Sequence, residues 1–179
     1  MATSNCAAKA LSGLARDCST SQGGIKAVWI APYEDVTKIE LNEGGDKIAT
    51  ISMNLEAKFK KYNFRKNTGS MSSTLTVDQA NGVNYVTTNL VLSFLRQDTQ
   101  KRIEMSALAV NELAVIVEDS NSTLWYLGYN EAVSATAGEG TTGQNKTDGN
   151  KYSITLTDDS ETFPFEVERT ALSTIVDAE

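Results

Sequence analysis

Histidine is absent from the 179-residue chain. Imidazole is the usual base near neutral pH, so its absence excludes the Ser-His-Asp and Cys-His catalytic arrangements and every histidine-ligated metal site. Cysteine is scarce as well, and the two residues present, Cys6 and Cys18, match no metal-binding spacing. This pair can form a disulfide in an oxidising compartment or remain as two reduced thiols. We therefore expect neither a metal nor a cofactor.

Long apolar runs and an excess of positive charge are both missing, which removes membranes and nucleic acids as general partners. No segment approaches the roughly 20 apolar residues that cross a bilayer, and the N-terminal region lacks the uninterrupted apolar stretch of a secretory signal. The formal net charge is −7, whereas each DNA phosphate that a protein neutralises normally requires a Lys or Arg. We expect a soluble protein that is made in the cytosol and has no membrane anchor.

Proline occurs only twice and aromatic residues make up 7% of the chain, whereas threonine and serine are abundant. This composition suits strands and turns around an aliphatic core, and the length fits one domain. We predict a mainly β fold, a β-sandwich or partial barrel, with one packed α-helix near residues 98–112. The expected parts are an N-terminal arm (residues 1–23), the β-sandwich domain (24–168) and a C-terminal tail (169–179).

Alternation of apolar and polar residues marks the predicted strands. The longest lies in VNYVTTNLVLSFLR, where one face consists of Val86, Thr88, Leu90, Leu92 and Phe94. Residues 36–41 and 47–53 predict a hairpin around the turn NEGGD, and residues 113–119 predict another with residues 123–137. A basic strand near residues 58–65 is expected to lead through the turn Asn67-Thr68-Gly69 into a Ser/Thr-rich strand.

The period changes in DTQKRIEMSALAVNE. Asp98 or Thr99 can cap the N-terminal amides of a helix. Ile103, Ala107 and Val110 then recur at spacings of four and three on one face. We predict a helix of about three turns with this face apolar.

A glycine-rich stretch resembles a phosphate-binding loop only in part. Gly138 and Gly143 have the required spacing, but Gln144 and Asn145 come before Lys146, where the lysine should follow directly. The stretch also lies between two predicted strands, with no helix whose N-terminus would hold an anion. We interpret it as a flexible hairpin tip that contacts another subunit or ring.

Two acidic clusters are candidate sites: Glu118 with Asp119, and Asp158 and Asp159 with Glu161. Paired carboxylates can hydrolyse glycosides or bind calcium. Neither cluster has the alternating spacing of a calcium loop, so we expect both in solvated turns. A small hydrolase that uses Asp158 and Glu161 is an alternative.

A basic run occupies residues 56–66, where five basic residues and one acid give a net charge of +4. Its aromatic residues could stack nucleic-acid bases, or the run could be an edge strand that lysines protect. A third interpretation pairs it with residues 157–179, where seven acids and one arginine give −6. Copies of the chain would then pack side by side, basic surface against acidic surface. Ordinary scatter of charge also accounts for this distribution.

The segment TLWYLGY suggests a different class of function. Trp125, Tyr126 and Tyr129 could form the stacking platform of a glycan- or surface-binding β-sandwich module. Trp125 and Leu127 share one face of the predicted strand and Tyr126 lies on the other, so only part of this group can face solvent. A role in the core is the competing interpretation.

Three stretches carry a resemblance to a known family: GGIKAVWIAPYEDV, ELAVIVEDSNSTLWYLGY and YSITLTDDSETFPFEV. Together with the basic strand and the single helix, they resemble tail-tube-like ring proteins of phages that infect Bacteroides-type gut bacteria, including crAss-like phages. The resemblance covers roughly residues 22–168 and consists of strand and turn patterns. It contains no catalytic motif.

The resemblance implies a virion structural protein of the tail or neck, made in the host bacterial cytoplasm. Six or twelve copies would form a ring around a channel through which DNA passes without specific binding. Neighbouring ring, portal and tail proteins would be its other partners, and it would have no small-molecule substrate and no enzyme activity. Contacts would come from the termini and from residues 54–72 and 138–150. The candidate subunit-interface residues are Lys58, Lys60, Lys61, Arg65, Lys66, Gly138, Gly140, Gly143, Lys146, Asp158, Asp159 and Glu161.

Overall fold

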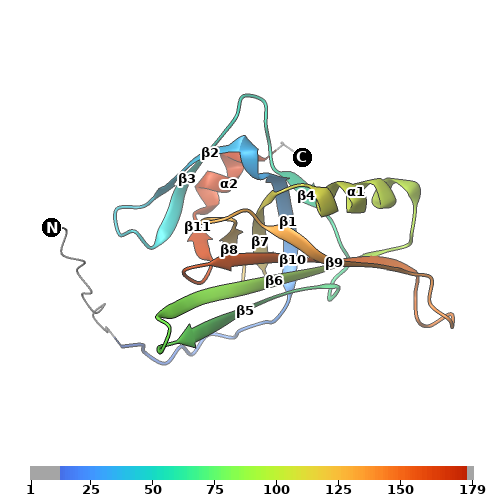
Figure 1. Ribbon diagram of the computed structural model, residues 1–179, viewed down its shortest axis with the longest axis horizontal. Helices are drawn as coiled ribbons and strands as arrows, with labels where there is room; N and C mark the ends of the chain where they lie inside the picture. The colour runs from blue at the N-terminus through green and yellow to red at the C-terminus, as the bar shows by residue number, and fades with distance from the viewer. Residues whose placement is uncertain (1–12, 177–179) are drawn as a thin grey trace.

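The computed structural model describes residues 13–176, which form two packed β-sheets and two α-helices (Figure 1). The mainly β fold and the packed helix predicted near residues 98–112 are confirmed. In chain order the elements are β1 (Ile25–Pro32), the 3-10 helix η1 (Tyr33–Asp35), β2 (Val36–Leu41), β3 (Lys47–Met53), β4 (Lys60–Tyr62), β5 (Gly69–Asp78), β6 (Val83–Leu95), α1 (Thr99–Val110), β7 (Leu113–Asp119), β8 (Leu124–Leu127), β9 (Ser134–Thr141), β10 (Lys151–Ser160), β11 (Phe165–Val167) and α2 (Arg169–Ile175).

The strands divide into a seven-stranded sheet 1, in the order β2-β3-β11-β8-β7-β1-β4, and a four-stranded sheet 2, in the order β5-β6-β10-β9. Neighbouring strands are antiparallel, except for the parallel pair β3 and β11. The strands of sheet 2 follow the longest axis of the molecule, and β1 crosses them steeply (Figure 1). The two sheets pack face to face as a sandwich.

The larger part of the core lies between the two sheets. Strand β6 buries the face that its alternation predicts, which consists of Val86, Thr88, Leu90, Leu92 and Phe94. From sheet 1, Val28 and Ile30 of β1 and Val115 and Val117 of β7 belong to the same cluster of buried side chains as Leu90, Leu92 and Phe94. Each fully buried Val, Leu or Ile contributes about 1.5–3 kcal/mol of transfer free energy, so this interface carries much of the stability.

The second face of sheet 1 is also covered. Trp29 and Ala31 of β1 pack there with Ile116 and Tyr126, so β1 is buried on both faces. Helix α2 and Phe59 close this second layer, and the backbone amide of Phe59 donates to the carbonyl oxygen of Ile175 at 2.9 Å. Strand β1 therefore has the uniform apolar character of a central strand rather than a clean alternation.

Helix α2 corrects the prediction of a C-terminal tail. Residues 169–175 are helical, and Ala171, Leu172 and Ile175 are buried against sheet 1. A helix of seven residues is unstable alone, so its sequence gives little signal and packing supplies the stability.

Helix α1 forms where it is predicted, with Asp98 as the N-cap, whose carboxylate accepts from the backbone amide of Lys101 at 2.8 Å. The predicted apolar face is wrong, because Ile103 is 55% exposed and Val110 is 82% exposed. Met105 and Leu108 pack against the core instead. The helix carries two apolar stripes at helical spacing, and docking buries one of them.

The chain changes sheets at two places where continuous hairpins are predicted. The predicted strand 123–137 stops at Leu127, and the chain crosses to sheet 2, where β9 begins at Ser134. Gly128 makes this exit possible, because its φ of +97° is unfavourable for other residues. Likewise, the basic strand β4 pairs with β1 in sheet 1, whereas the following strand β5 pairs with β6 in sheet 2. The hairpins β2–β3 and β7–β8 are confirmed.

The crossing is fastened by Asp158, which corrects its expected place in a solvated turn. Asp158 is 2% exposed, and its carboxylate accepts from the backbone amide of Gly128 at 3.2 Å. Burial raises the pKa of Asp158 to about 6. The Gly128 amide opposes this rise, and the nearby charges of Asp159 and Glu131 add to it.

Asp158→Asn is expected to change the pH dependence of stability. The folded-state pKa of Asp158 is about 6, above the ordinary value of 3.8, so the folded protein binds this proton more tightly than the unfolded chain does. The stability that this group contributes is complete below about pH 4 and is lost as the pH rises through 6. Urea unfolding should therefore show that the free energy of unfolding of the variant, relative to that of the wild type, increases between pH 4 and pH 7. An equal difference at both pH values would contradict the assignment.

Tyr126→Phe is expected to leave the fold as stable or to stabilise it by about 1–3 kcal/mol. The Tyr126 hydroxyl is buried and has no hydrogen-bond partner among residues 13–176, so its removal relieves a desolvation cost. Thermal and urea unfolding measure the change, with Tyr129→Phe as the partly exposed control. A clear loss of stability in Tyr126→Phe would mean that a buried water satisfies the hydroxyl.

Candidate assembly surfaces

Sheet 2 ends in two strands that are paired on one side only. Strand β5 pairs with β6, and β9 pairs with β10. Proteins ordinarily protect such edges with lysine, proline or a bulge. Strand β5 (GSMSSTLTVD) has none of these, and its only charged residue, Asp78, stands at its end. In β9 (SATAGEGT) the only charged residue is Glu139, and the pairing with β10 has one irregularity, at Thr136.

The free backbone groups of β5 can be assigned from its register. The backbone amide of Ser93 donates to the carbonyl oxygen of Thr68 at 2.9 Å, so these two residues form a hydrogen-bonded pair next to β5. Bonded and non-bonded pairs alternate in antiparallel strands, and β5 and β6 pair without a register shift. The residues of β5 whose backbone groups point away from β6 are therefore Gly69, Met71, Ser73, Leu75 and Val77.

The two free edges of sheet 2 run in opposite directions, because its four strands alternate along the order β5-β6-β10-β9. A second copy placed beside the first in the same orientation therefore brings its β5 antiparallel to β9. Such pairing continues the sheet without inverting any copy, which is the head-to-tail contact that a closed ring requires.

The outer face of sheet 2 is polar and nearly free of cations. The Thr157 hydroxyl donates to the Asn89 amide oxygen at 2.9 Å and lies 2.8 Å from the Thr136 hydroxyl, which links three strands on this face. The Thr87 hydroxyl donates to Asp159 at 2.6 Å. Lys151 is the only Lys or Arg in the four strands of this sheet.

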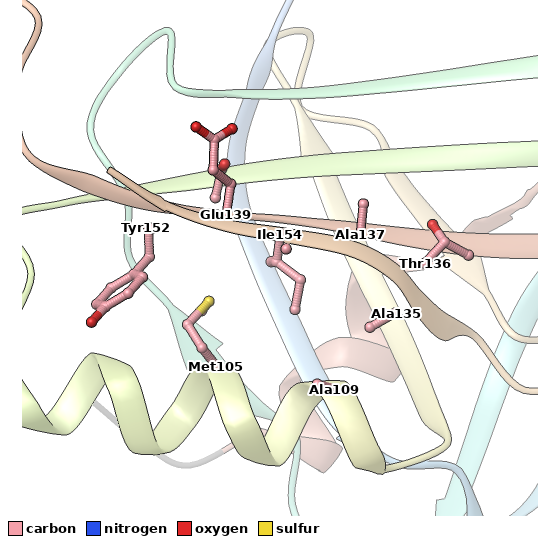
Figure 2. Close-up of a pocket in the computed structure, with 11 residues that line it drawn as sticks. Met105, Ala109, Ala135, Thr136, Ala137, Glu139, Tyr152 and Ile154 are labelled. Carbon is pink, nitrogen blue, oxygen red and sulfur yellow. The ribbon is translucent and has the colours of Figure 1, made fainter. Parts of the chain in front are cut away.

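A groove of about 390 Å³ separates β9 from α1 (Figure 2). Met105 and Ala109 of α1 line one side, and the small residues Ala135, Gly138 and Gly140 of β9 line the other. The two glycines are therefore strand residues, which corrects their predicted place in a loop. A Cβ atom on Gly140 would lie 2.8 Å from the Tyr152 ring, so close packing requires glycine there.

The hairpin tip is shorter than predicted and comprises residues 142–150. Asp148 organises it by accepting from the backbone amides of Gln144 at 3.0 Å and Asn145 at 2.7 Å. Gly143 has a φ of +70°, and Lys146 is exposed. Strand β10 follows directly, so no helix begins within or immediately after the tip. The hairpin interpretation of this stretch is confirmed.

The basic run is divided among different surroundings. The Lys58 ammonium donates to the carbonyl oxygen of Thr174 at 2.7 Å, beside α2. Lys60 and Lys61 are exposed on β4, the edge strand of sheet 1. Arg65 and Lys66 are exposed in the turn that leads into β5. The run is therefore no single patch.

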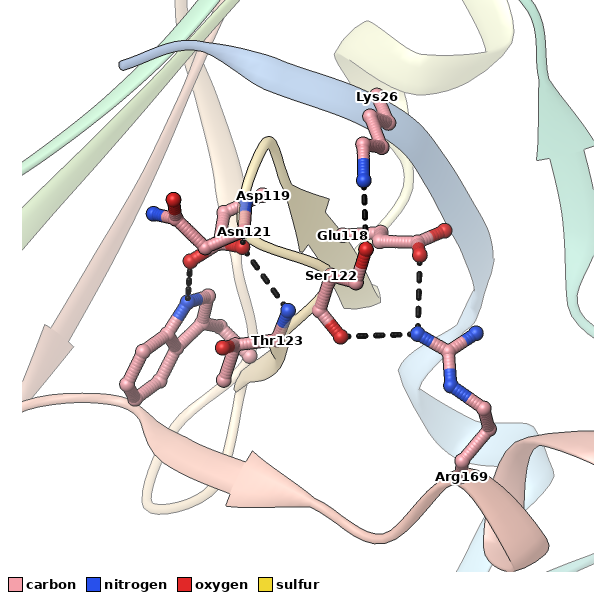
Figure 3. A network of polar contacts seen from close by, with 8 residues as sticks. Lys26, Glu118, Asp119, Asn121, Ser122, Thr123 and Arg169 are labelled. Carbon is pink, nitrogen blue, oxygen red and sulfur yellow. Dashed lines mark hydrogen bonds and ion pairs between the residues drawn. The ribbon is translucent and has the colours of Figure 1, made fainter. Parts of the chain in front are cut away.

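The turn between β7 and β8 holds a polar network that the sequence did not reveal (Figure 3). Asp119 accepts from the backbone amides of Asn121 at 2.8 Å and Thr123 at 2.9 Å. The Arg169 guanidinium of α2 donates to Glu118 at 3.0 Å and to the carbonyl oxygen of Ser122 at 2.8 Å. These acids organise a turn and hold α2, which corrects their interpretation as solvated groups.

The same turn holds the N-terminal arm. The backbone amide of Gln22 donates to the Asn121 side chain at 2.9 Å, and the Asn121 side-chain amide donates back to the carbonyl oxygen of Gln22 at 3.2 Å. Lys26 donates to the Ser122 hydroxyl at 2.6 Å. Cys18, farther along the arm, is exposed, and Cys6 lies outside the described residues.

The three aromatic residues of the predicted glycan platform do not share an exposed surface. Tyr126 is 1% exposed, in the core. The Trp125 indole donates to Asp119 at 3.1 Å, and the Tyr129 ring packs 4.7 Å from the ring of Phe165. These contacts give each aromatic residue a structural role.

The remaining candidate chemistry is not assembled within residues 13–176. Asp158 is enclosed, whereas Glu161 is exposed. That part of the chain contains no group of three or more Cys, Asp or Glu side chains that could hold a metal ion. None of its helices has the length and apolar character needed to cross a membrane.

Comparisons with known proteins do not identify the chain. No protein-family model, no curated protein and no solved structure matches it.

Proposed function

We propose that this protein is a structural subunit of a phage virion and that its copies form a ring by pairing β9 of one subunit with β5 of the next. The ring, of six or twelve copies, lies in the tail or neck and conducts DNA. The observation that carries this proposal is the pair of oppositely directed free edges of sheet 2. The subunit acts mechanically and catalyses no reaction.

Edge pairing supplies a physical reason for association. The outward backbone groups of β5 gain partners, each hydrogen bond contributing about 0.5–1.5 kcal/mol. Leu75 and Val77, which are 47% and 55% exposed, project from the same edge strand and lose contact with water. A ring also removes both free edges of every sheet 2, which protects the protein from irregular aggregation.

The outer face of sheet 2 suits the wall of a DNA channel. Its exposed groups include the hydroxyls and amides of β6, β9 and β10, together with the carboxylates of Asp159 and Glu139. DNA phosphates are retained chiefly by Lys and Arg, and the strands of this sheet contain only Lys151. A neutral to acidic wall would let DNA slide without specific binding.

The setting within a virion comes from the resemblance of residues 22–168 to tail-tube-like ring proteins. Synthesis would take place in the host bacterial cytoplasm, and neighbouring ring, portal and tail proteins would be the further partners. The rival interpretations gain no comparable support. Tyr126 of the glycan platform and Asp158 of the hydrolase are both buried.

Ser73→Pro tests the edge contact. The backbone amide of Ser73 points away from β6, so proline removes a donor from the free edge and keeps the ladder within the sheet. Ser73→Ala is the matched control, because it also loses the hydroxyl contact with Thr88 at 2.8 Å but keeps the amide. Light scattering and negative-stain electron microscopy should show multimeric rings for Ser73→Ala and smaller species for Ser73→Pro.

Circular dichroism must confirm that the two variants have the same fold. If Ser73→Pro does not fold, Thr74→Lys serves instead, since it adds an exposed charge to the edge and leaves every backbone amide in place. Rings of equal size and yield in the control and in the edge variant would refute the proposed contact. A strictly monomeric wild type at high concentration would refute the ring itself.

A further inference from the structure

The two ends of sheet 2 carry opposite charge. The register places the start of β5, the end of β6, the end of β9 and the start of β10 at one end. The other end contains the turn from β5 to β6, the end of β10 and the entry to β9. Because these strands follow the longest axis of the molecule, the two ends are far apart (Figure 1).

The first end, here called the basic end, gathers cations from three segments that are distant in the sequence. It consists of Arg65, Lys66, Arg96, Lys146 and Lys151. Backbone hydrogen bonds hold the segments together: the amide of Arg96 donates to the carbonyl oxygen of Asn150 at 2.6 Å, and the amide of Ser93 donates to that of Thr68 at 2.9 Å. Asp148 also lies at this end, where its carboxylate accepts from backbone amides of its own loop, and its charge reduces the sum of the five cations from +5 to +4.

The opposite end, here called the acidic end, is formed by Asp78, Glu131, Asp159 and Glu161. No Lys or Arg occurs in the segments that build it, residues 78–86, 129–136 and 157–162. The Ser160 hydroxyl donates to the Asn130 side chain at 2.7 Å and joins the end of β10 to the segment that enters β9. Asp158 is buried and takes no part in this surface.

The charged residues of these two ends form no ion pairs within the described chain, although Asp98, which is ion-paired with Lys101, lies close enough to Arg96 to interact with its charge. Over residues 13–176, no member of either end belongs to an ion pair. Glu131, Asp159 and Glu161 are exposed, as are Arg65, Arg96 and Lys146. A monomer therefore presents two unpaired charged surfaces of opposite sign at opposite ends of its long axis.

We propose that copies of this chain associate end to end, with the basic end of one copy against the acidic end of the next. In the assembly proposed above, on which this inference rests, the contact stacks one ring upon another in a fixed direction. A reversed copy would bring like charges together, so the charges select orientation as well as contact. A head-to-tail contact of this kind extends into an open stack.

Two charge-reversal variants test this contact. The basic-end variant is Arg65→Glu with Lys66→Glu and Lys146→Glu, which leaves two cations against three acids among its five residues. The acidic-end variant is Glu131→Lys with Asp159→Lys and Glu161→Lys, which leaves one acid against three cations. All six side chains are exposed, and among residues 13–176 only Asp159 takes part in a side-chain hydrogen bond, from the Thr87 hydroxyl, so the substitutions spare the core. Each variant alone would have two ends of the same sign, whereas a mixture of the two restores complementary ends.

Sedimentation velocity and electron microscopy at about 0.05 M and about 1 M salt provide the measurement. The wild type should form long stacks at low salt that are lost at high salt, since the Debye length is only about 3 Å at 1 M. Each variant alone should lose the stacks, and an equimolar mixture should recover them. Stacks that persist in either variant, or a mixture that stays unstacked, would overturn the proposal.

The readouts separate this inference from the proposed ring. Rings that form in both variants and in their mixture, without stacking, would refute the end-to-end contact and leave the ring intact. Linear particles that the mixture restores, with no ring in any sample, would support the contact and refute the ring. A short DNA duplex bound by the wild type and lost in the basic-end variant, with stacking unchanged, would assign the basic end to an anionic partner instead.

Discussion

The burial of sheet 1 on both faces is the constraint on which the rest of the structure depends. Strands β1 and β7 pack against sheet 2 through Val28 and Val115, and against the α2 layer through Trp29 and Ile116. Neither layer can be removed without exposing a row of large apolar side chains to water. The crossing at Gly128 and the polar turn at Asp119 both attach other parts of the chain to sheet 1. Because sheet 1 and its two covering layers carry the stability, the fold does not require partners for the edge strands or the charged ends of sheet 2.

The strand pattern was predictable where one rule governs it. Strand β6 has one face toward the core, so strict alternation identified every buried residue from Val86 to Phe94. The position of helix α1 was predicted correctly, but the face that it buries was not. Its two apolar stripes are equivalent in the sequence, and only the packing against the sheets decides which one is buried. Helix α2 and the crossing at Gly128 depend on contacts between residues far apart in the sequence, which local periodicity does not encode.

The sequence allowed the charged residues of the candidate surfaces to be named, but not their arrangement on the surface. The sequence predicted Arg65, Lys66 and Lys146 as contact residues, and the fold brings them to one end of sheet 2. The sequence suggested that the basic run of one copy contacts the acidic segment 157–179 of the next. The fold instead places the acids of that segment in different surroundings. Asp158 is buried, and Glu166 pairs with Lys47 at 2.7 Å in sheet 1. Charge counted along a chain does not specify where charge lies on a surface, because the register of the strands decides it.

The number of strands in sheet 2 has a consequence for symmetry. A sheet of alternating strands has oppositely directed edges only when the number of strands is even, as it is here with four. An odd number would give edges that run the same way, and antiparallel addition would then invert every second copy. Even parity lets every copy keep one orientation, so any particle built through these edges has two chemically different faces and an inherent direction.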